Sequence, residues 1–243
     1  MQSTIFQDNP KVSVLLSVYN DEKNIDRSIE SILVQTYTNL EVLILDDCST
    51  DNTFNICNKF KKLDKRIKLF RNDSNIGLTR SLNKLISIAE GEFYARQDSD
   101  DYSYPQRIEK QLIFMRSNKI DLCGSQAITI NSGEKFPKFS VYLNPKYIAK
   151  YKNPFIHGTL MFSKKLVDRL GGYDENFYYA QDYKLIHDAI NLNFKTSNLK
   201  KVLYKLNDNE NRISVKNIEE QNYFAECVRN NIKPTTQRFN KYE

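Results

Sequence analysis

The stretch EFYARQDSDD (Glu92–Asp101) decides the fold class of this chain. Its first residues form a short apolar run that predicts a strand, and three acids follow where that strand ends. Carboxylates crowded in this way repel one another unless a cation lies among them. Mg²⁺ and Mn²⁺ prefer such hard oxygen ligands and often bind through one or two carboxylates plus substrate phosphates.

Two apolar runs lie upstream. KVSVLLSV (Lys11–Val18) is nearly continuous and predicts a strand buried on both faces of a parallel sheet. EVLIL (Glu41–Leu45) predicts a second strand and leads directly into Asp46 and Asp47. Amphipathic helical patterns separate these runs, which indicates βαβ units. Because ligands of open α/β sheets bind beyond the carboxyl ends of the strands, we expect both acidic clusters to line one metal–diphosphate pocket.

The chain after the acidic cluster predicts a less regular second half. Pro105 is expected to open a helix, since proline is tolerated in the first helical turn. Further elements are expected as strands over 121–130 and 159–162, and as helices over 163–170, 182–191 and 217–228.

Composition limits the class of protein. The 243 residues are 40% hydrophobic, which suits one sizeable α/β domain. The seven glycines form no glycine-rich loop, which argues against a P-loop or a dinucleotide-binding site. No apolar run approaches the ~18 residues of a membrane span, and the first residues lack the pattern of a signal peptide. The four cysteines lack CxxC spacing, so we expect reduced thiols in a cytoplasmic protein.

A basic segment lies in the second half. The net charge is +6, and residues 135–169 carry eight lysine and arginine residues against one acid, Asp168, with aromatic residues between them. This pattern is typical either of a solvated surface or of a surface for anionic groups, such as lipid head groups or a pyrophosphate-bearing acceptor. Nucleic acid is not an expected partner, because no recognition motif accompanies the charge.

Six short motifs follow one another along the chain. They are SVYN (Ser17–Asn20), LDDCSTD (Leu45–Asp51), NIGL (Asn75–Leu78), AEGEFYARQDSDD (Ala89–Asp101), PQR (Pro105–Arg107) and GGYDE (Gly171–Glu175), with Gln181 and Asp182 behind them. Each motif alone is weak, but the ordered series resembles glycosyltransferase family 2, the inverting nucleotide-sugar enzymes with the GT-A fold. The resemblance covers Lys11 to Ala189.

The resemblance implies an α/β fold with a Rossmann-like, mostly parallel central sheet flanked by helices, a smaller acceptor-side region and a C-terminal helical tail. The expected parts are an N-terminal extension (1–10), a nucleotide-sugar-binding half (11–101), an acceptor-binding half of the same domain (102–206) and the tail (207–243).

The resemblance also implies roles for single residues. Tyr19 matches an aromatic that stacks on the nucleobase, and Asp47 matches an acid that accepts a hydrogen bond from a ring N–H. Asp98 and Asp100 match the DxD pair, in which Asp100 would bind Mn²⁺ or Mg²⁺ and Asp98 would lie near the ribose or the metal. Asp182 matches the catalytic base.

Other motif residues are expected on one side of the pocket or the other. Ser17, Asn20 and Ser99 are expected on the donor side. Arg80 is a candidate partner of the diphosphate, or else a solvated helix residue. His157 and Gln181 are candidates for the acceptor side. Gln181 stands where the family more often has Glu, which removes one charge that would act on Asp182.

The resemblance predicts transfer of a sugar from a UDP-sugar, with dTDP as the nearest rival nucleotide, to a lipid-linked saccharide acceptor. The setting would be synthesis of an O-antigen, a capsule or a similar surface glycan by a peripheral protein on the inner face of the cell membrane. One alternative is a non-catalytic sugar-nucleotide-binding module on the same fold. Another is a nucleotidyltransferase, which would need a glycine-rich N-terminal loop, whereas Val14–Asn20 contains no glycine.

Overall fold

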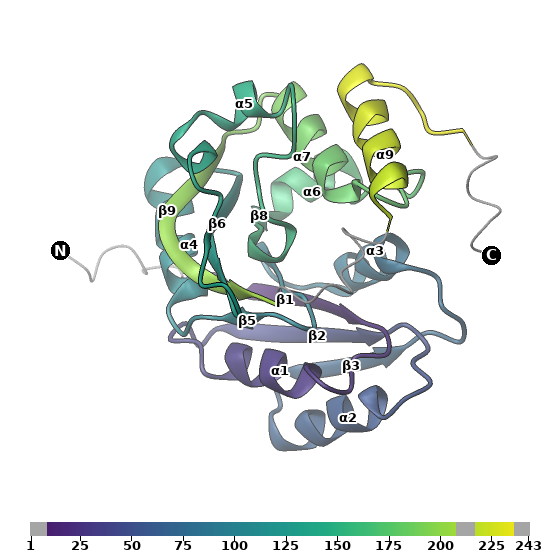
Figure 1. Ribbon diagram of the computed structural model, residues 1–243. Coiled ribbons are helices and arrows are strands. Elements are labelled where there is room, and N and C mark those ends of the chain that lie inside the picture. The colour runs from purple at the N-terminus through teal and green to yellow at the C-terminus, as the bar shows by residue number, and fades with distance from the viewer. Residues whose placement is uncertain (1–8, 208–216, 236–243) are drawn as a thin grey trace.

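The computed structural model describes residues 9–207 and 217–235 (Figure 1). Most of the expected N-terminal extension and two parts of the expected tail, 208–216 and 236–243, lie outside the described residues. Within the described part, the strands form one sheet of nine, in the order β3-β2-β1-β4-β8-β6-β9-β5, with β7 paired to β6. This arrangement confirms the predicted α/β class.

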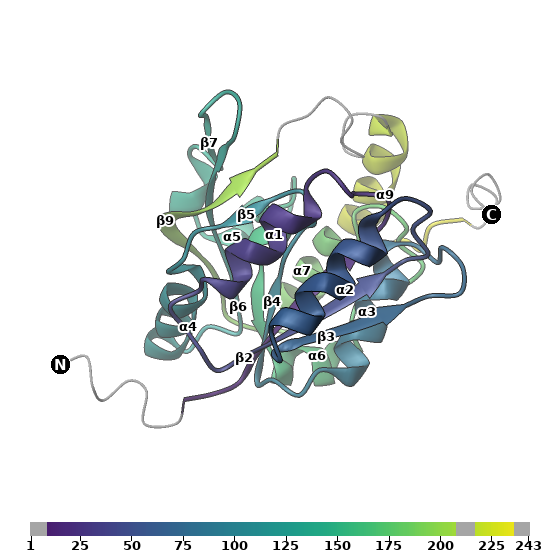
Figure 2. The same ribbon diagram turned by 90° about the horizontal axis from the view of Figure 1, so that it is seen from below.

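The N-terminal half of the sheet is parallel and alternates with helices. Its strands are β1 (Val12–Val18), β2 (Leu40–Asp46), β3 (Ile67–Arg71) and β4 (Phe93–Arg96). The connecting helices are α1 (Ile25–Leu33), α2 (Thr53–Leu63) and α3 (Leu78–Ile88). Figure 2 shows α1 and α2 side by side on one face of these strands.

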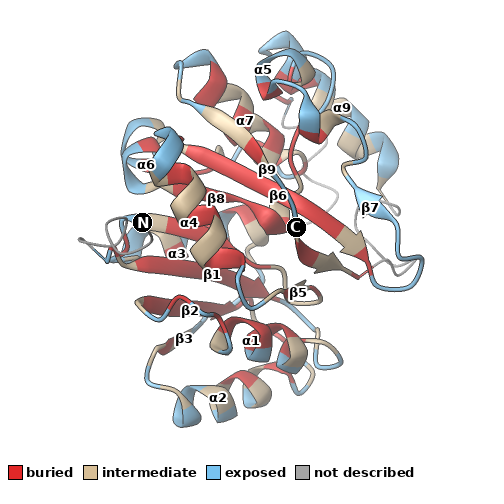
Figure 3. Ribbon diagram, turned by 90° about the vertical axis from the view of Figure 1, so that its left-hand side faces the viewer, coloured by how far each residue is buried: buried red, intermediate tan, exposed pale blue. Residues whose placement is uncertain are grey.

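Burial on both faces explains why β1 is an almost continuous apolar run. Every residue of β1 is buried. Val12, Val14 and Leu16 pack in a core with α1, α2 and α4, whereas Leu15 packs in a second core with α3, α6 and α7. Figure 3 shows the central strands buried and the outer helices exposed on their outward sides. Two hydrophobic layers therefore enclose the sheet.

The second half of the sheet begins with a reversal of chain direction. β8 (Met161–Ser163) runs antiparallel to β4, and β6 (Leu122–Thr129) runs antiparallel to β8. β9 (Thr196–Leu206) then pairs with β6 in parallel, with register shifts around Gln126. The short strands are β5 (Tyr102–Ser103) and β7 (Lys135–Phe136).

Five helices and two 3₁₀ turns complete the second half of the described chain. They are α4 (Arg107–Asn118), η1 (Ser140–Tyr142), α5 (Pro145–Ile148), η2 (His157–Thr159), α6 (Lys164–Leu170), α7 (Gln181–Asn191) and α9 (Ile218–Asn230). The predicted final helix is present as α9, and its Phe224 and Val228 belong to the core around α7. Among the described residues, no helix combines the length and the apolar character needed to cross a membrane.

The carboxyl ends of three strands meet at one edge of the sheet. β1 and β2 are in register up to Val18 and Asp46, and β4 lies beside β1 with Arg96 opposite Leu15. The loops that leave these ends carry Tyr19, Asp47 and the acidic cluster, so the topology brings the predicted donor side together.

Candidate active site

A buried arginine fixes the first acid of the cluster. Arg96, the last residue of β4, is 1% exposed, and its guanidinium lies 2.6 Å from Asp98 Oδ1. Arg107, fully buried at the start of α4, donates to the Arg96 carbonyl at 2.7 Å and stacks on the Tyr204 ring at 4.8 Å. The PQR motif therefore supports the strand that presents the acids. Arg96 is thus a structural ion-pair partner of Asp98.

Asp98 is enclosed from several directions. Its backbone N–H donates to Tyr204 Oη at 3.1 Å, and its carbonyl accepts from Ser28 Oγ at 2.8 Å. A methyl group added at Gly158 would lie 2.5 Å from Asp98 Oδ2 and 2.5 Å from the Tyr204 hydroxyl. Glycine at position 158 is therefore what allows this approach of η2 to the acidic loop.

Ser99 and Asp100 form the rim of the acidic loop. Ser99 Oγ donates to Asp21 Oδ2 at 2.6 Å, which ties the acidic loop to the loop after β1. Arg27 of α1 donates to the Asp100 carbonyl at 2.7 Å. The side chain of Asp100 is partly exposed. Asp100 is thus less buried than its neighbour Asp101, which is 4% exposed.

Asp101 has a different environment. It is 4% exposed, and its Oδ1 accepts from the backbone N–H of Asn207 at 2.7 Å. Burial raises the pKa of Asp101 well above its ordinary value, and the charges of Asp98 and Asp100 act in the same direction. Asp101 therefore anchors the acidic loop to the end of β9, whereas Asp98 and Asp100 are partly exposed.

Asp98 and Asp100, which are both partly exposed, suit a divalent cation whose remaining ligands come from a phosphate. Within the described residues, no group of three or more His, Cys, Asp or Glu side chains is arranged to hold a metal alone. Mg²⁺ and Mn²⁺ bind through as few as one or two carboxylates when substrate phosphates complete the shell. Arg96 pairs with Oδ1 of Asp98, whereas Oδ2 lies beside Gly158, and Asp100 would supply a second carboxylate. These donors fit the expected ion.

The nucleobase side is built by the loops after β1 and β2. Tyr19 is 48% exposed, whereas Ser17 is buried at the end of β1. Asn20 adopts a left-handed conformation with φ of 48°, and its Oδ1 accepts from the Thr50 N–H at 2.8 Å. The two strand-end loops are therefore locked to each other, and the Tyr19 ring is left at the surface beside them.

Asp47 organises the loop before α3. The carboxylate is 3% exposed and accepts from Asn72 Nδ2 at 2.7 Å, the Ile76 N–H at 3.0 Å and the Gly77 N–H at 2.8 Å. This contact explains why the NIGL motif accompanies the acidic pair. An ionised carboxylate has about four acceptor positions, so three donors leave room for one more.

Asp182, the predicted base, lies in the first turn of α7, where the helix dipole favours an anion. Its Oδ1 accepts from the Tyr183 N–H at 2.8 Å. Its Oδ2 accepts from Asn153 Nδ2 at 2.6 Å. Sequence reasoning missed Asn153, because Asn-Pro in an irregular segment predicts only a turn. The preceding residue, Ala180, has φ of 55°, so the turn into α7 is a strained one.

His157 connects the donor side and the acceptor side. Its Nε2 lies 3.1 Å from the hydroxyl of Tyr173 in the GGYDE motif. Burial lowers the pKa of His157, the Arg96 charge lowers it further, and the charges of Asp182 and Asp98 oppose both. The segment around His157 touches both acids, because Asn153 donates to Asp182 Oδ2 at 2.6 Å and Gly158 lies against Asp98 Oδ2. The fold therefore brings Asp98 and Asp182 to the same region from positions far apart in the sequence.

The two remaining candidates have plainer surroundings. Gln181, the first residue of α7, is 9% exposed. Arg80 lies on α3 with its side chain 59% exposed, and its Nε is 3.6 Å from Glu175 Oε2. Arg80 therefore forms a surface ion pair with Glu175.

Comparisons with known proteins identify the family of this chain. A model of the family described as glycosyl transferase family 2 matches residues 13–171. The putative glycosyltransferase EpsE of Bacillus subtilis (strain 168) is 35% identical over 204 residues, which cover 82% of this chain and 73% of EpsE. WfaP of Escherichia coli, a UDP-Glc:alpha-D-GlcNAc-diphosphoundecaprenol beta-1,3-glucosyltransferase, is 32% identical over 189 residues, which cover 77% of this chain and 73% of WfaP.

Among solved structures, S. aureus TarS 1-349 in complex with UDP-GlcNAc superposes with a TM-score of 0.75 at 24% identity. The match covers 90% of this chain and 65% of the TarS chain. The fold is the GT-A fold expected from the sequence, and the family model and the curated relatives define a glycosyltransferase. The chain belongs to glycosyl transferase family 2.

Proposed function

We propose that this protein moves a sugar from a UDP-sugar to a hydroxyl group of a saccharide acceptor in the synthesis of a bacterial surface polysaccharide. The observation that carries this proposal is that residues 153–158 contact both acids: Asn153 donates to Asp182 Oδ2 at 2.6 Å, and Gly158 lies against Asp98 Oδ2. A single displacement needs the donor diphosphate on one side of the reacting carbon and a base on the other. Acids from two separate parts of the chain, Asp98 for the donor side and Asp182 for the acceptor side, would supply both.

The donor side suits a uracil nucleotide. Tyr19 is exposed enough to stack on a base, and Asp47 has one acceptor position left for a ring N–H. The name of the relative WfaP specifies UDP-Glc as its donor. We expect UDP to bind more tightly than GDP. Titration calorimetry that shows GDP preferred would overturn this assignment of the base.

Asp100 and Asp98 are the residues that would hold Mn²⁺ or Mg²⁺. When bound, the ion would offset the negative charge that develops on the leaving diphosphate. Arg96 pairs with Asp98 at 2.6 Å and Gly158 lies against its Oδ2, so both contacts keep Asp98 in one position before any ligand arrives. The protein thus presents its oxygen donors without having to rearrange the strand end.

Asp182 is proposed as the general base. A carboxylate at this point can take the proton of the acceptor hydroxyl while that oxygen attacks the anomeric carbon. Asn153 holds one carboxylate oxygen and so orients the other. One displacement without a covalent intermediate inverts the anomeric centre, so an α-linked donor gives a β-linked product.

The acceptor is proposed to be a saccharide linked through a diphosphate to a lipid, as the name of WfaP describes for that enzyme. His157 and Gln181 would line the acceptor side of the pocket. A lipid-linked acceptor places the reaction at the inner face of the cell membrane, with the protein bound there peripherally.

Replacing the base tests this proposal. Asp182→Asn keeps the shape of the side chain but cannot accept a proton, so turnover should fall ~10²–10⁴-fold while UDP affinity stays near wild type. The matched control is Asp188→Asn on the same helix, where the carboxylate pairs with Lys184 at 2.7 Å. Loss of donor binding in Asp182→Asn, with turnover preserved at saturating donor, would make Asp182 a donor ligand. A protein that binds UDP-sugars but neither transfers nor hydrolyses them would be a binding module.

A further inference from the structure

A series of exposed apolar side chains marks the segment between β7 and β8. Five large side chains within residues 139–151 have exposed fractions between 55% and 81%. We call them the α5 face: Phe139, Tyr142, Leu143, Tyr147 and Tyr151. Soluble proteins rarely expose so many large apolar groups together unless the surface binds something.

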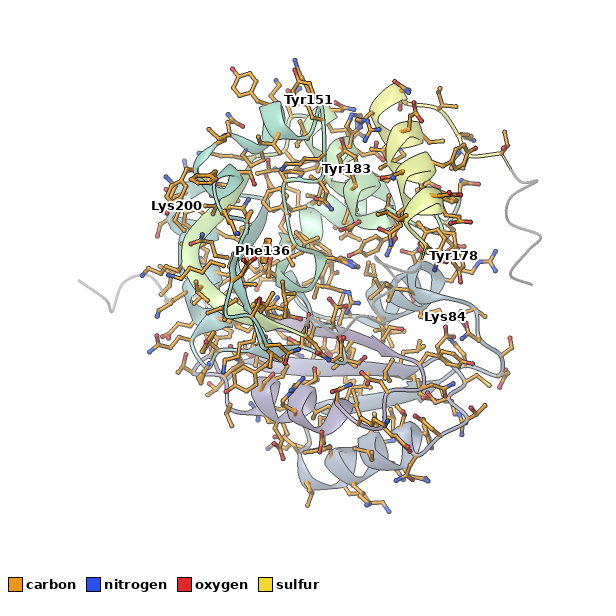
Figure 4. All side chains as sticks on the ribbon, in the orientation of Figure 1. Lys84, Phe136, Tyr151, Tyr178, Tyr183 and Lys200 are labelled. Atoms are coloured by element: carbon orange, nitrogen blue, oxygen red, sulfur yellow. The ribbon has the colours of Figure 1, made fainter. Side chains whose placement is uncertain are left out.

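The α5 face stands on a packed support. Val141, Pro145 and Ala149, on the inner side of η1 and α5, are buried. Tyr183 of α7 is 2% exposed and donates to the Ala149 carbonyl at 2.6 Å. Figure 4 shows Tyr183 beneath α5 and Tyr151 projecting from the top of the molecule, away from the protein. The outward orientation is therefore built into the fold.

Positive charge surrounds the α5 face. The exposed lysines along it are Lys138, Lys146, Lys150 and Lys152, with Lys200 on the adjacent β9. The Lys200 ammonium lies 5.3 Å from the centre of the Tyr142 ring. The sequence from 135 to 167 contains no Asp or Glu. Lys138 pairs with Glu134 at 3.4 Å, so the lysines that carry the argument are Lys146, Lys150, Lys152 and Lys200. Apolar rings set among these lysines complement a surface that is apolar inside and anionic outside.

We propose that the α5 face is the surface on which the protein lies on an anionic lipid bilayer. Tyrosine side chains favour the level of the lipid head groups, because the ring is apolar and the hydroxyl group can be hydrated. Lysines beside them are drawn to anionic lipid, and interfacial helices combine the same two groups. The chain then runs from Tyr151 to Asn153, the partner of Asp182. The bilayer would thus lie next to the acceptor side of the site, a consequence that rests on the proposed function.

The charge component is tested by sedimenting the full chain with vesicles of phosphatidylcholine alone and of phosphatidylcholine mixed with phosphatidylglycerol. Wild-type protein should bind the mixed vesicles at low salt. Reversing three lysines of the α5 face should lower the partition coefficient by on the order of 10²-fold: Lys146→Glu, Lys150→Glu and Lys152→Glu. The matched control reverses three exposed lysines of α2, which lies at the opposite end of the molecule from α5 (Figures 1 and 3): Lys59→Glu, Lys61→Glu and Lys62→Glu.

The apolar component is tested by Tyr147→Ser with Tyr151→Ser. This pair should weaken binding at low salt at least tenfold, whereas Leu63→Ser on α2, which also removes an apolar side chain exposed by 81%, should leave it unchanged. Equal loss from the α2 and α5 lysine variants would reduce the effect to net charge and overturn the proposal. The proposal would also be overturned if the wild type bound neither kind of vesicle. It would be overturned too if the protein were a dimer that only the Tyr147→Ser, Tyr151→Ser double variant dissociated.

The result of the vesicle-binding experiment does not depend on the proposed function. Transfer to an acceptor with a short, water-soluble lipid should persist in the α5-face variants, because none of these residues lies in the site. If the wild type binds vesicles as expected but transfers no sugar, the proposed function fails and the docking surface stands.

Discussion

Asn153→Asp should move the acid limb of the pH–rate profile to higher pH. The change replaces the Nδ2 donor, 2.6 Å from Asp182 Oδ2, with a second carboxylate oxygen. Two unit charges at that separation repel by ~1.6 kcal/mol in water and by ~6 kcal/mol at an effective dielectric constant of 20. Both side chains are partly exposed, so the lower end applies, at ~2 kcal/mol. Since one pH unit corresponds to ~1.4 kcal/mol, the limb should rise by about 1–2 units.

The assay is kcat for sugar transfer as a function of pH at saturating donor and acceptor. A base must be ionised to work, so the variant should lose most at acidic pH and recover as the pH rises. Asn144→Asp is the matched control, because Asn144 caps α5 by accepting from the Lys146 N–H and tolerates an acid there. An acid limb of Asn153→Asp that coincides with that of the wild type would refute the assignment of Asp182 as the base held by Asn153.

Three further changes test other parts of the account. Asp100→Ala should abolish transfer and weaken UDP binding in Mn²⁺, and full wild-type activity in excess EDTA would contradict the metal assignment. Gly158→Ala should displace Asp98, because the added methyl group would lie 2.5 Å from Oδ2. The kcat for transfer should fall by at least tenfold. The free energy of unfolding, measured by denaturant titration, should fall by ~1–3 kcal/mol. Burial alone would raise the pKa of Glu41, but hydrogen bonds from Ser13, Lys68 and the Glu90 backbone hold it below its ordinary value. This carboxylate therefore stabilises the fold above the unfolded-state pKa and loses that contribution as the pH falls, so the stability gap between wild type and Glu41→Gln should shrink below about pH 4.

The sequence predicts the parallel half of the sheet well, because its strands are apolar in themselves. β1 and β2 are buried on every residue, so their composition carries the signal without any partner. Strand β9 was missed for the opposite reason. Its sequence TSNLKKVLYKL (Thr196–Leu206) lacks regular alternation, and shifts in its register with β6 break the period of two. Pairing with β6, which is distant in the sequence, determines that strand, and the local residue pattern does not predict it.

The acids of the site could be found from local motifs, but their partners could not. Asp98 and Asp182 stand in recognisable stretches of sequence. Asn153 meets Asp182 across 29 positions, and Asp101 meets Asn207 across 106. Such contacts depend on the packing of whole elements. Local sequence therefore indicates the candidate acids, and the fold determines which side chains contact them.

The anomeric configuration of the product tests the central claim most directly. Wild-type protein would be supplied with an α-linked UDP-sugar, Mn²⁺ and a lipid-diphosphate-linked saccharide, and the new linkage would be assigned by the proton coupling constant of its anomeric centre in NMR. Because Asp182 would activate the acceptor for one displacement opposite the diphosphate, we predict a β-linked product. An α-linked product would contradict the single displacement and the role of Asp182 on which this account depends.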